Sequence, residues 1–272
     1  MNKLKLLISL FKYSIINPRG GIELFRSRYN VWQDARDNQS IYHYHNITEE
    51  LDGIIRNLFP KYELSIPKMK QNLVQLQNHI NNFFERLDNK QYPSKSNPYL
   101  SAYMLDSKSS LLLYILCKLI KPEKVVETGV AYGLSGSYIL QALDENDYGK
   151  LFSIDYVFRP WESKQMIGAI IPTHLRKRWN FVYGIASQKL KSLLDSLGTI
   201  DIFFHDSQHT YRNMKYEFDT VWPFLKKGGF MLSDDISGNN AFYEFYSKRN
   251  LKPIILSQDR KAGSFLEIIQ KL

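Results

Sequence analysis

The chain has 272 residues, 44 % of them hydrophobic and 23 % charged, which is ordinary for a globular protein and excludes a disordered chain. Its formal net charge of +9 favours anionic partners, but the basic residues are scattered without a recognition motif, so we expect no specific nucleic-acid role. The single cysteine, Cys117, excludes an intramolecular disulfide and indicates a reducing, cytoplasmic environment.

Residues 1–100 predict a helical N-terminal extension that caps an acceptor site or mediates dimerisation. In its first helix the apolar residues fall on one face, and the apolar run is too short to cross a bilayer. This face comprises Leu4, Leu7, Ile8, Phe11 and Ile15. We expect it to pack against the body of the protein or a second subunit in a homo-oligomer, with a peripheral membrane contact as the alternative.

Two more helices are predicted in this extension. Asn46 and Glu49 form a capping box, which predicts a helix that begins at Ile47 and that Pro60 ends. After Pro67, apolar residues repeat every three or four positions, at Met69, Leu73, Leu76, Ile80, Phe83 and Leu87. A seam this narrow predicts that the second helix packs against a partner helix, within the chain or across a dimer.

From residue 101 to residue 272, short apolar strands alternate with helical patterns, which is typical of a parallel α/β sheet. Strands are predicted at 124–128, 151–155, 180–183, 200–204, 230–233, 253–257 and 264–269, and helices at 108–120, 134–143, 161–178, 188–197 and 209–225. The last two strands predict a C-terminal antiparallel hairpin. We therefore expect a doubly wound, Rossmann-like domain with a mostly parallel seven-stranded sheet.

A glycine-bearing turn follows the first of these strands, in the sequence Val125-Val-Glu-Thr-Gly-Val-Ala-Tyr-Gly-Leu-Ser135. Gly129 and Gly133 let the backbone pass close to a ligand at a helix N-terminus, and their spacing differs from the G-x-G-x-x-G that holds a pyrophosphate. Glu127 would repel a pyrophosphate but suits an amine-bearing ligand. Asp155 ends the next strand, where it can accept both hydroxyls of a ribose. The alternative is that the glycines serve only the turn and Asp155 only caps a helix.

Three carboxylates and a histidine follow the fourth and fifth predicted strands. Asp206 and His209 come after the fourth strand, and Asp234 and Asp235 after the fifth. Because neighbouring strand ends meet in an open parallel sheet, these carboxylates repel one another unless a proton or cation lies among them. Oxygen ligands suit Mg²⁺, Mn²⁺ or Ca²⁺ better than zinc. His205 is expected to be a buried histidine without a catalytic role.

These motifs resemble those of class I S-adenosylmethionine (SAM)-dependent methyltransferases. The pattern E-T-G-x-x-x-G-x-S, followed by an aspartate at the end of the second strand, is similar to their cofactor motifs. The resemblance implies that the glycine turn holds the methionine part of SAM, Asp155 the ribose, and Gly184 and Ile185 the adenine. The residues it assigns to the cofactor are Glu127, Gly129, Tyr132, Gly133, Ser135, Asp155, Gly184, Ile185 and Asp206.

The second half of this region resembles the metal-dependent sugar O-methyltransferases, the group that includes macrocin O-methyltransferase. The similarity rests on D-x-x-H at Asp206 and His209, W-x-x-L-K-x-G-G at Trp222–Gly229, and the acidic pair Asp234 and Asp235. In catechol-type relatives a lysine occupies the position of His209, which favours the sugar-methylating branch. This resemblance implies an acceptor that is a sugar or a glycosylated small molecule.

A hydroxyl group is a poor nucleophile until it loses its proton, which suggests a mechanism for this set of residues. Mg²⁺ or Mn²⁺ held by Asp206, Asp234 and Asp235 would lower the pKa of a bound hydroxyl, and His209 would take the proton as a general base. Asp206 thus counts among the catalytic residues. The alternatives are an NAD(P)-dependent oxidoreductase on a similar fold and a non-catalytic glycan-binding protein.

Overall fold

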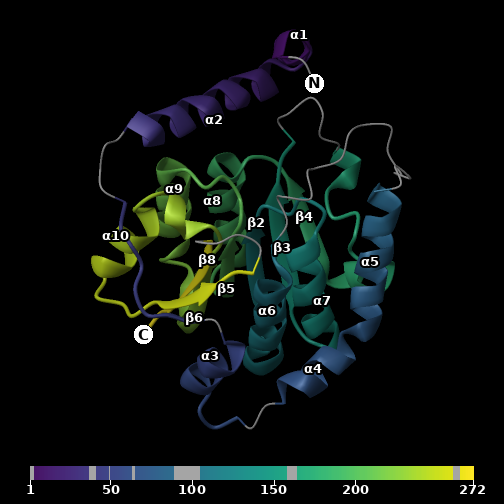
Figure 1. The fold of residues 1–272 in the computed structure, drawn as a ribbon, viewed down its shortest axis with the longest axis vertical. Coiled ribbons are helices and arrows are strands. Elements are labelled where there is room, and N and C mark those ends of the chain that lie inside the picture. The colour runs from purple at the N-terminus through teal and green to yellow at the C-terminus, as the bar shows by residue number, and fades with distance from the viewer. Residues whose placement is uncertain are drawn as a thin grey trace.

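The protein is described by a computed structural model that covers residues 3–36, 41–48, 50–62, 65–88, 105–157, 164–259 and 264–272. Its centre is an eight-stranded sheet with the order β1-β7-β8-β6-β5-β2-β3-β4 (Figure 1). The strands are β1 (Ile47–Thr48), β2 (Lys124–Thr128), β3 (Lys150–Asp155), β4 (Trp179–Tyr183), β5 (Ile200–His205), β6 (Leu225–Ser233), β7 (Ile254–Ser257) and β8 (Phe265–Gln270). Only β8 runs antiparallel to its neighbours, β6 and β7. The doubly wound fold and its C-terminal hairpin are therefore confirmed.

Helices cover both faces of the sheet, because successive strand residues point to opposite sides. Val125 and Phe204 belong to one hydrophobic core, whereas Val126 and Phe203 belong to the other. The first core is shared with α3 (Leu51–Leu58), α5 (Val74–Asp88), α6 (Ser107–Ile120) and α7 (Leu134–Glu145), and the second with α8 (Ala186–Leu197), α9 (Tyr211–Val221) and α10 (Ala241–Ser247). The central strands β2 and β5 are largely apolar because both of their faces are buried.

The eighth strand was not predicted, because Ile47 was assigned to a helix. Ile47 and Thr48 instead pair with β7, at the edge of the sheet. The predicted capping box is wrong: Asn46 has a φ of 58°, and α3 begins at Leu51, four residues after the predicted start at Ile47, with Glu50 at the N-cap position. Edge strand β1 therefore ties part of the N-terminal extension to the sheet.

The predicted seam helix is two helices, α4 (Ile66–Asn72) and α5, which meet at Leu73. The seam packs within the chain, since Leu73, Leu76 and Ile80 are buried in the core that α7 shares. Farther along the chain, the helical stretch expected at 161–178 contains the two 3₁₀ helices Lys164–Met166 and Thr173–Arg178, and its residues before 164 lie outside the described part.

The N-terminal helices α1 (Lys3–Ile16) and α2 (Pro18–Arg36) lie across the end of the sheet where β2 to β6 have their carboxyl ends (Figure 1). Packing of the apolar face of α1 against the body is wrong for its described side chains: Leu7, Phe11 and Ile15 are 62 %, 69 % and 63 % exposed. Among the described residues, none of the helices is long and apolar enough to cross a membrane.

Candidate functional site

The carboxyl ends of β2, β3, β4, β5 and β6 bring the predicted site residues to one edge of the sheet. Gly129 follows β2, Asp155 ends β3 and Gly184 follows β4, while Asp206 follows β5 and Asp234 follows β6. The strand order places β2 between β3 and β5. The turn after β2 therefore lies between the aspartate of β3 and the aspartate of β5, as an open parallel sheet requires.

The turn after β2 depends on glycine at two positions. Gly129 has a φ of +85°, and a Cβ there would lie 2.0 Å from the carbonyl oxygen of Asp206. Gly133 has a φ of +92°, and a Cβ there would lie 2.9 Å from the Cα of Gly168. Both glycines thus combine a backbone conformation that disfavours side chains with a close backbone approach. The loop after β5 can lie against the turn only because residue 129 has no side chain.

Glu127 lies beneath the turn and is fully buried. Its carboxylate accepts hydrogen bonds from the hydroxyl groups of Ser135 and Ser153, the latter at 2.8 Å. Burial raises the pKa of Glu127 to about 7, although the two serine hydroxyl groups oppose the shift. The carboxylate therefore links β2, β3 and the start of α7, and it lies under the position proposed for an amine-bearing ligand.

Asp155 braces the same turn from the end of β3. Its Oδ2 accepts hydrogen bonds from the backbone N–H groups of Val130 and Ala131, at 3.0 and 2.9 Å, and its Oδ1 accepts one from Tyr156 at 2.6 Å. Burial raises the pKa of Asp155, and these N–H groups offset part of that rise. Because a carboxylate offers about four acceptor positions, one remains for a ribose hydroxyl, rather than the two hydroxyl groups that the sequence interpretation assigned to Asp155.

Gly184 and Ile185 follow β4, and the backbone N–H of Gly184 donates to the carbonyl of Asp155 at 3.0 Å. Two aromatic rings lie at these strand ends, Tyr156 and Tyr183, with centroids 5.2 Å apart. The sequence interpretation missed both, although each is adjacent to an assigned residue. Both lie where the resemblance places the adenine.

Tyr132 points away from this edge of the sheet. It is fully buried, and its ring packs against Phe83 and Phe84 of α5, with centroid distances of 5.4 and 6.4 Å. Its side chain thus anchors the turn in the core. A bound ligand in the crevice can meet only the backbone of this residue.

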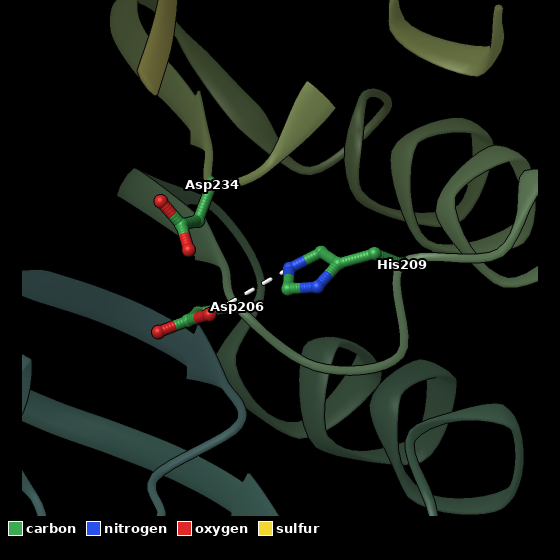
Figure 2. Close-up of side chains that lie close together, drawn as sticks. All are labelled: Asp206, His209 and Asp234. Carbon is green, nitrogen blue, oxygen red and sulfur yellow. Dashed lines mark ion pairs between the residues drawn. The ribbon is translucent and has the colours of Figure 1, made fainter. Parts of the chain in front are cut away.

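Asp206, His209 and Asp234 converge beside the turn (Figure 2). One ligand atom from each lies within 4.8 Å of the others, and Nε2 of His209 is 3.6 Å from Oδ1 of Asp206. The backbone N–H of Asp206 donates to the carbonyl of Thr128 at 2.8 Å, which fixes the loop after β5 to β2. Asp234 is buried, and its Oδ1 accepts a hydrogen bond from the amide of Gln258. Two carboxylates and one imidazole thus face one another.

Asp235 lies outside this cluster, although the sequence interpretation assigned it to the metal. Its backbone is left-handed, with a φ of 47°, and it occupies the N-cap position of the 3₁₀ helix Ile236–Gly238. Its Oδ1 accepts a hydrogen bond from Ser264 at 3.4 Å. The reversal of the backbone separates the side chains of the two neighbouring aspartates, so that Asp234 alone joins Asp206 and His209.

A buried glutamate of α9, Glu217, connects the loops of the site. Its Oε2 accepts hydrogen bonds from Thr128 Oγ1 at 2.5 Å and His205 Nδ1 at 2.7 Å, and its Oε1 accepts from Ser207 Oγ at 2.7 Å and Asn213 Nδ2 at 3.0 Å. Burial acts to raise the pKa of Glu217, but the charge of His205 and these hydrogen bonds outweigh it and lower the pKa.

His205 is fully buried, as the sequence predicts, and its Nδ1 lies 2.7 Å from Oε2 of Glu217. The sequence interpretation missed Glu217. The available signal was its place on the apolar face of α9, beside Met214, Phe218 and Val221. An acidic residue at a core position is rare unless it is paired.

A pocket of about 480 Å³ opens beside the cluster. It is lined by Val31, Asp34, Ala35, Ile41, His209, Thr210, Tyr211, Gly238, Asn239 and Asn240. Helix α2 forms one wall, held by hydrogen bonds from the backbone N–H of Tyr211 to Asp34 at 2.8 Å and from Gln208 to Ser27 at 2.7 Å. His209 therefore belongs both to the cluster and to the wall of the pocket.

Comparisons with known proteins agree with this geometry. Residues 126–236 match the family Methyltransf_24, described as a methyltransferase domain. A comparison with curated proteins finds no match.

Several solved structures share the fold. An O-methyltransferase from Bacillus cereus in complex with SAH has 12 % sequence identity and a TM-score of 0.55 over 82 % of this chain and 98 % of its own. TomG, an O-methyltransferase from Streptomyces achromogenes in complex with SAM, has 15 % identity and a TM-score of 0.53 over 82 % and 97 %. The SAH-bound methyltransferase PaMTH1 from Podospora anserina has 15 % identity and a TM-score of 0.52 over 86 % and 99 %.

The matched region, 126–236, contains the glycine turn, Asp155, the cluster of Asp206, His209 and Asp234, and most of the strands that position them. It matches a methyltransferase domain, and it is part of a chain with the fold of class I methyltransferases. The chain is therefore an enzyme of the methyltransferase class.

Proposed function

We propose that the protein is a SAM-dependent O-methyltransferase that methylates a hydroxyl group of a sugar or of a glycosylated small molecule. The observation that carries this proposal is the placement of His209, which lies in the cluster with Asp206 and Asp234 and also lines the 480 Å³ pocket. A hydroxyl bound in this pocket lies beside a group that can take its proton. The glycine turn and Asp155, on the other side of Asp206, are where the methyl donor would bind.

The residues of the cluster fit a divalent metal ion. One ligand atom from each of the three residues lies within 4.8 Å of the other two, and carboxylate oxygens are the ligands that Mg²⁺ and Mn²⁺ prefer. Asp206 and Asp234 would hold the ion, and Gln258 keeps the Asp234 carboxylate in place. A divalent ion bound there would lower the pKa of a hydroxyl group coordinated to it.

His209 is proposed as the general base. Its Nε2 faces Asp206, whose carboxylate stabilises the imidazolium form, and its backbone carbonyl accepts a hydrogen bond from Asn239 at 3.3 Å. An imidazole titrates near neutral pH, so it can accept the proton as the oxygen attacks the methyl group. Glu217 acts only as a positioning residue, because its hydrogen bonds hold the two loops that carry the reacting groups.

The lining of the pocket favours a sugar as the acceptor. Polar side chains such as Asn239, Asn240 and Asp34 lie beside the apolar Val31 and Ile41. A sugar ring presents hydroxyl groups at its rim and C–H groups on its faces, so it matches a wall that is polar in part and apolar in part. The pocket can also hold more than one ring, since ligand sites of about 300–1,000 Å³ enclose drug-sized molecules.

Calorimetric titration of the purified protein with SAM, and with NAD in parallel, tests the cofactor assignment. We expect saturable SAM binding that Asp155→Ala weakens at least tenfold, because that substitution removes the acceptor beside the turn. Exposed Asp195 of α8 offers the matched control, Asp195→Ala, which should bind SAM as the wild type does. Binding of NAD without SAM would refute the assignment.

Titration with Mn²⁺, followed by electron paramagnetic resonance, tests the cluster. Asp234→Asn should weaken binding at least tenfold, whereas Asp235→Asn should leave it within about twofold. His209→Ala should retain Mn²⁺ binding but lose about 10² to 10⁴ in the rate of methyl transfer to an acceptor found by screening glycosides with labelled SAM. If His209→Ala loses Mn²⁺ as fully as Asp234→Asn does, His209 is a metal ligand and its assignment as the base is wrong.

A further inference from the structure

The N-terminal helices expose an apolar surface on the side turned away from the sheet. In α1 the exposed side chains include Leu7, Phe11 and Ile15, which recur every four residues and therefore share one face. In α2 they include Ile22, Phe25, Tyr29 and Trp32, which are spaced 3, 4 and 3 residues apart and share one face; Val31 is also exposed but lies off this face. We call these seven residues the outer face of α1 and α2.

The inner face of α2 makes the contacts with the rest of the protein. Ser27 accepts a hydrogen bond from Gln208, and Asp34 accepts one from the backbone of Tyr211. At 100° per residue, Ser27 and Asp34 lie on the opposite side of the helix from Phe25 and Trp32. The helix is attached to the protein through this inner face, so the apolar residues of its outer face are not needed to hold it in place.

Basic side chains flank the outer face. Lys12, Arg19, Arg26, Arg28 and Arg36 are all exposed, whereas Glu23 and Asp34 are less exposed. By the same helical geometry, Arg26 and Arg28 lie on either side of the Ile22–Trp32 stripe. Arg36 lies 4.7 Å above the ring of Trp32, and the rings of Tyr29 and Trp32 are 5.8 Å apart. The surface thus combines an apolar stripe, aromatic residues with polar edges, and positive charge at its borders.

We propose that the outer face of α1 and α2 docks on the surface of a membrane that contains anionic lipids. The positive border complements anionic headgroups, while the apolar stripe enters the boundary between headgroups and acyl chains, where Trp and Tyr side chains are favoured. A second copy of the chain fits this face less well, because a two-fold contact brings the arginines of both copies together. Helix α2, with 19 residues, lies parallel to the membrane surface in this docking, because the opposite face of the helix is held to the protein through Ser27 and Asp34.

This docking has a consequence for the acceptor, which rests on the proposed function. Val31, Asp34 and Ala35 of α2 line the pocket beside His209. The helix that meets the membrane is thus also the wall of the acceptor site. An acceptor hydroxyl attached to a lipid carrier can enter the pocket while the lipid itself remains in the bilayer.

Flotation of the full-length protein with lipid vesicles tests the docking. Vesicles of phosphatidylcholine with phosphatidylglycerol should carry the protein upward, and pure phosphatidylcholine vesicles should carry at least tenfold less. The double variant Phe25→Ser/Trp32→Ser should lose at least tenfold in the bound fraction, since it removes the two largest apolar groups of α2. Its matched control, Tyr62→Ser/Tyr148→Ser, changes exposed aromatic residues elsewhere and should bind as the wild type does.

A charge variant and a measurement of mass complete the test. Arg19→Gln/Arg28→Gln should weaken binding to the anionic vesicles several-fold, as should raised salt, while Lys177→Gln/Lys248→Gln should not. Light scattering gives the oligomeric state. A dimer that Phe25→Ser/Trp32→Ser dissociates, together with equal binding to both kinds of vesicle, would overturn the proposal in favour of a second copy. SAM titration of the variants that no longer bind vesicles separates the two proposals: a variant that still binds SAM has lost docking alone.

Discussion

Replacing Glu217 with glutamine should destabilise the protein strongly, although the change conserves size. The carboxylate accepts four hydrogen bonds, two on each oxygen, from Thr128, His205, Ser207 and Asn213. In Glu217→Gln one oxygen becomes an NH₂ group that faces two donors. Hydrogen bonds to a charged group are worth about 1.5–3 kcal/mol each. Because the hydroxyl groups can rotate and recover part of this energy, we expect the free energy of unfolding to fall by about 2–4 kcal/mol.

The pH dependence gives this prediction a second, independent readout. The pKa of Glu217 is lowered in the folded protein, so the folded state binds its proton less tightly than the unfolded state does. Its contribution is therefore complete above the unfolded pKa of about 4.3 and is lost as the pH falls through that value toward the lowered one. Glutamine has no such titration, so the difference in unfolding free energy between the two proteins should shrink as the pH falls below about 4.3.

Urea unfolding followed by tryptophan fluorescence at pH 7 and pH 4 measures both effects. Asp219→Asn is the matched control, since Asp219 lies on the same helix but is exposed and pairs only with Lys215 and Arg249 among described partners. We expect its effect to stay below about 0.5 kcal/mol. If Glu217→Gln matches this control at pH 7, the carboxylate does not hold the network that the geometry assigns to it. A difference from wild type that grows on acidification would refute the sign of the pKa shift.

Three further predictions follow from other residues. Gly129→Ala should lower the unfolding free energy by about 2–4 kcal/mol and weaken Mn²⁺ binding, because its Cβ would lie 2.0 Å from the carbonyl oxygen of Asp206. A Cβ at Gly53 in α3 would make only an ordinary contact with Thr48 at 3.9 Å, so Gly53→Ala should be neutral or stabilising in urea unfolding. Glu267 is buried on β8 with its pKa raised well above the usual value, so the stability it contributes is lost as the pH rises above about 4.3. Glu267→Gln should therefore raise the melting temperature at pH 8 more than at pH 5, and a lower melting temperature at pH 8 would contradict this. Asn239→Ala should slow methyl transfer without changing Mn²⁺ affinity, because Asn239 donates a hydrogen bond to the backbone carbonyl of His209. A variant with weaker Mn²⁺ binding but an unchanged rate of methyl transfer would contradict this role.

Much of the fold could be predicted because the parallel strands are buried on both faces. Most of them contain a short apolar run, and the last residue of the strand marks the edge where ligands bind in an open sheet. Asp155, Asp206 and Asp234 each lie at or directly after such a strand end, so their common location followed from topology alone. The two-residue strand β1 was missed because a pattern of residues cannot distinguish so short an edge strand from the start of the neighbouring helix.

Side-chain direction was harder to predict than location. Asp234 and Asp235 are adjacent and chemically identical, yet a left-handed φ at Asp235 sends them to different partners. Tyr132 lies in the assigned turn but points into the core, because α5 supplies two aromatic rings there. Both outcomes depend on segments distant in sequence, Ser264 in one case and Phe83 and Phe84 in the other. A motif gives the position of its residues along the chain and leaves these directions open.

The apolar periodicity of the N-terminal helices does not by itself identify the contact they make, since a core face, a subunit contact and a membrane contact all produce the same pattern. The structure narrows the choice because α2 has two faces with different contacts. Asp34 on the inner face holds the N-terminus of α9, which carries Tyr211 at the pocket wall, while Phe25 on the outer face is 71 % exposed. Substitutions on the two faces should therefore separate: Asp34→Asn should alter acceptor affinity and spare vesicle binding, and Phe25→Ser should do the reverse. If either substitution changed both properties equally, the two faces of α2 would not act independently.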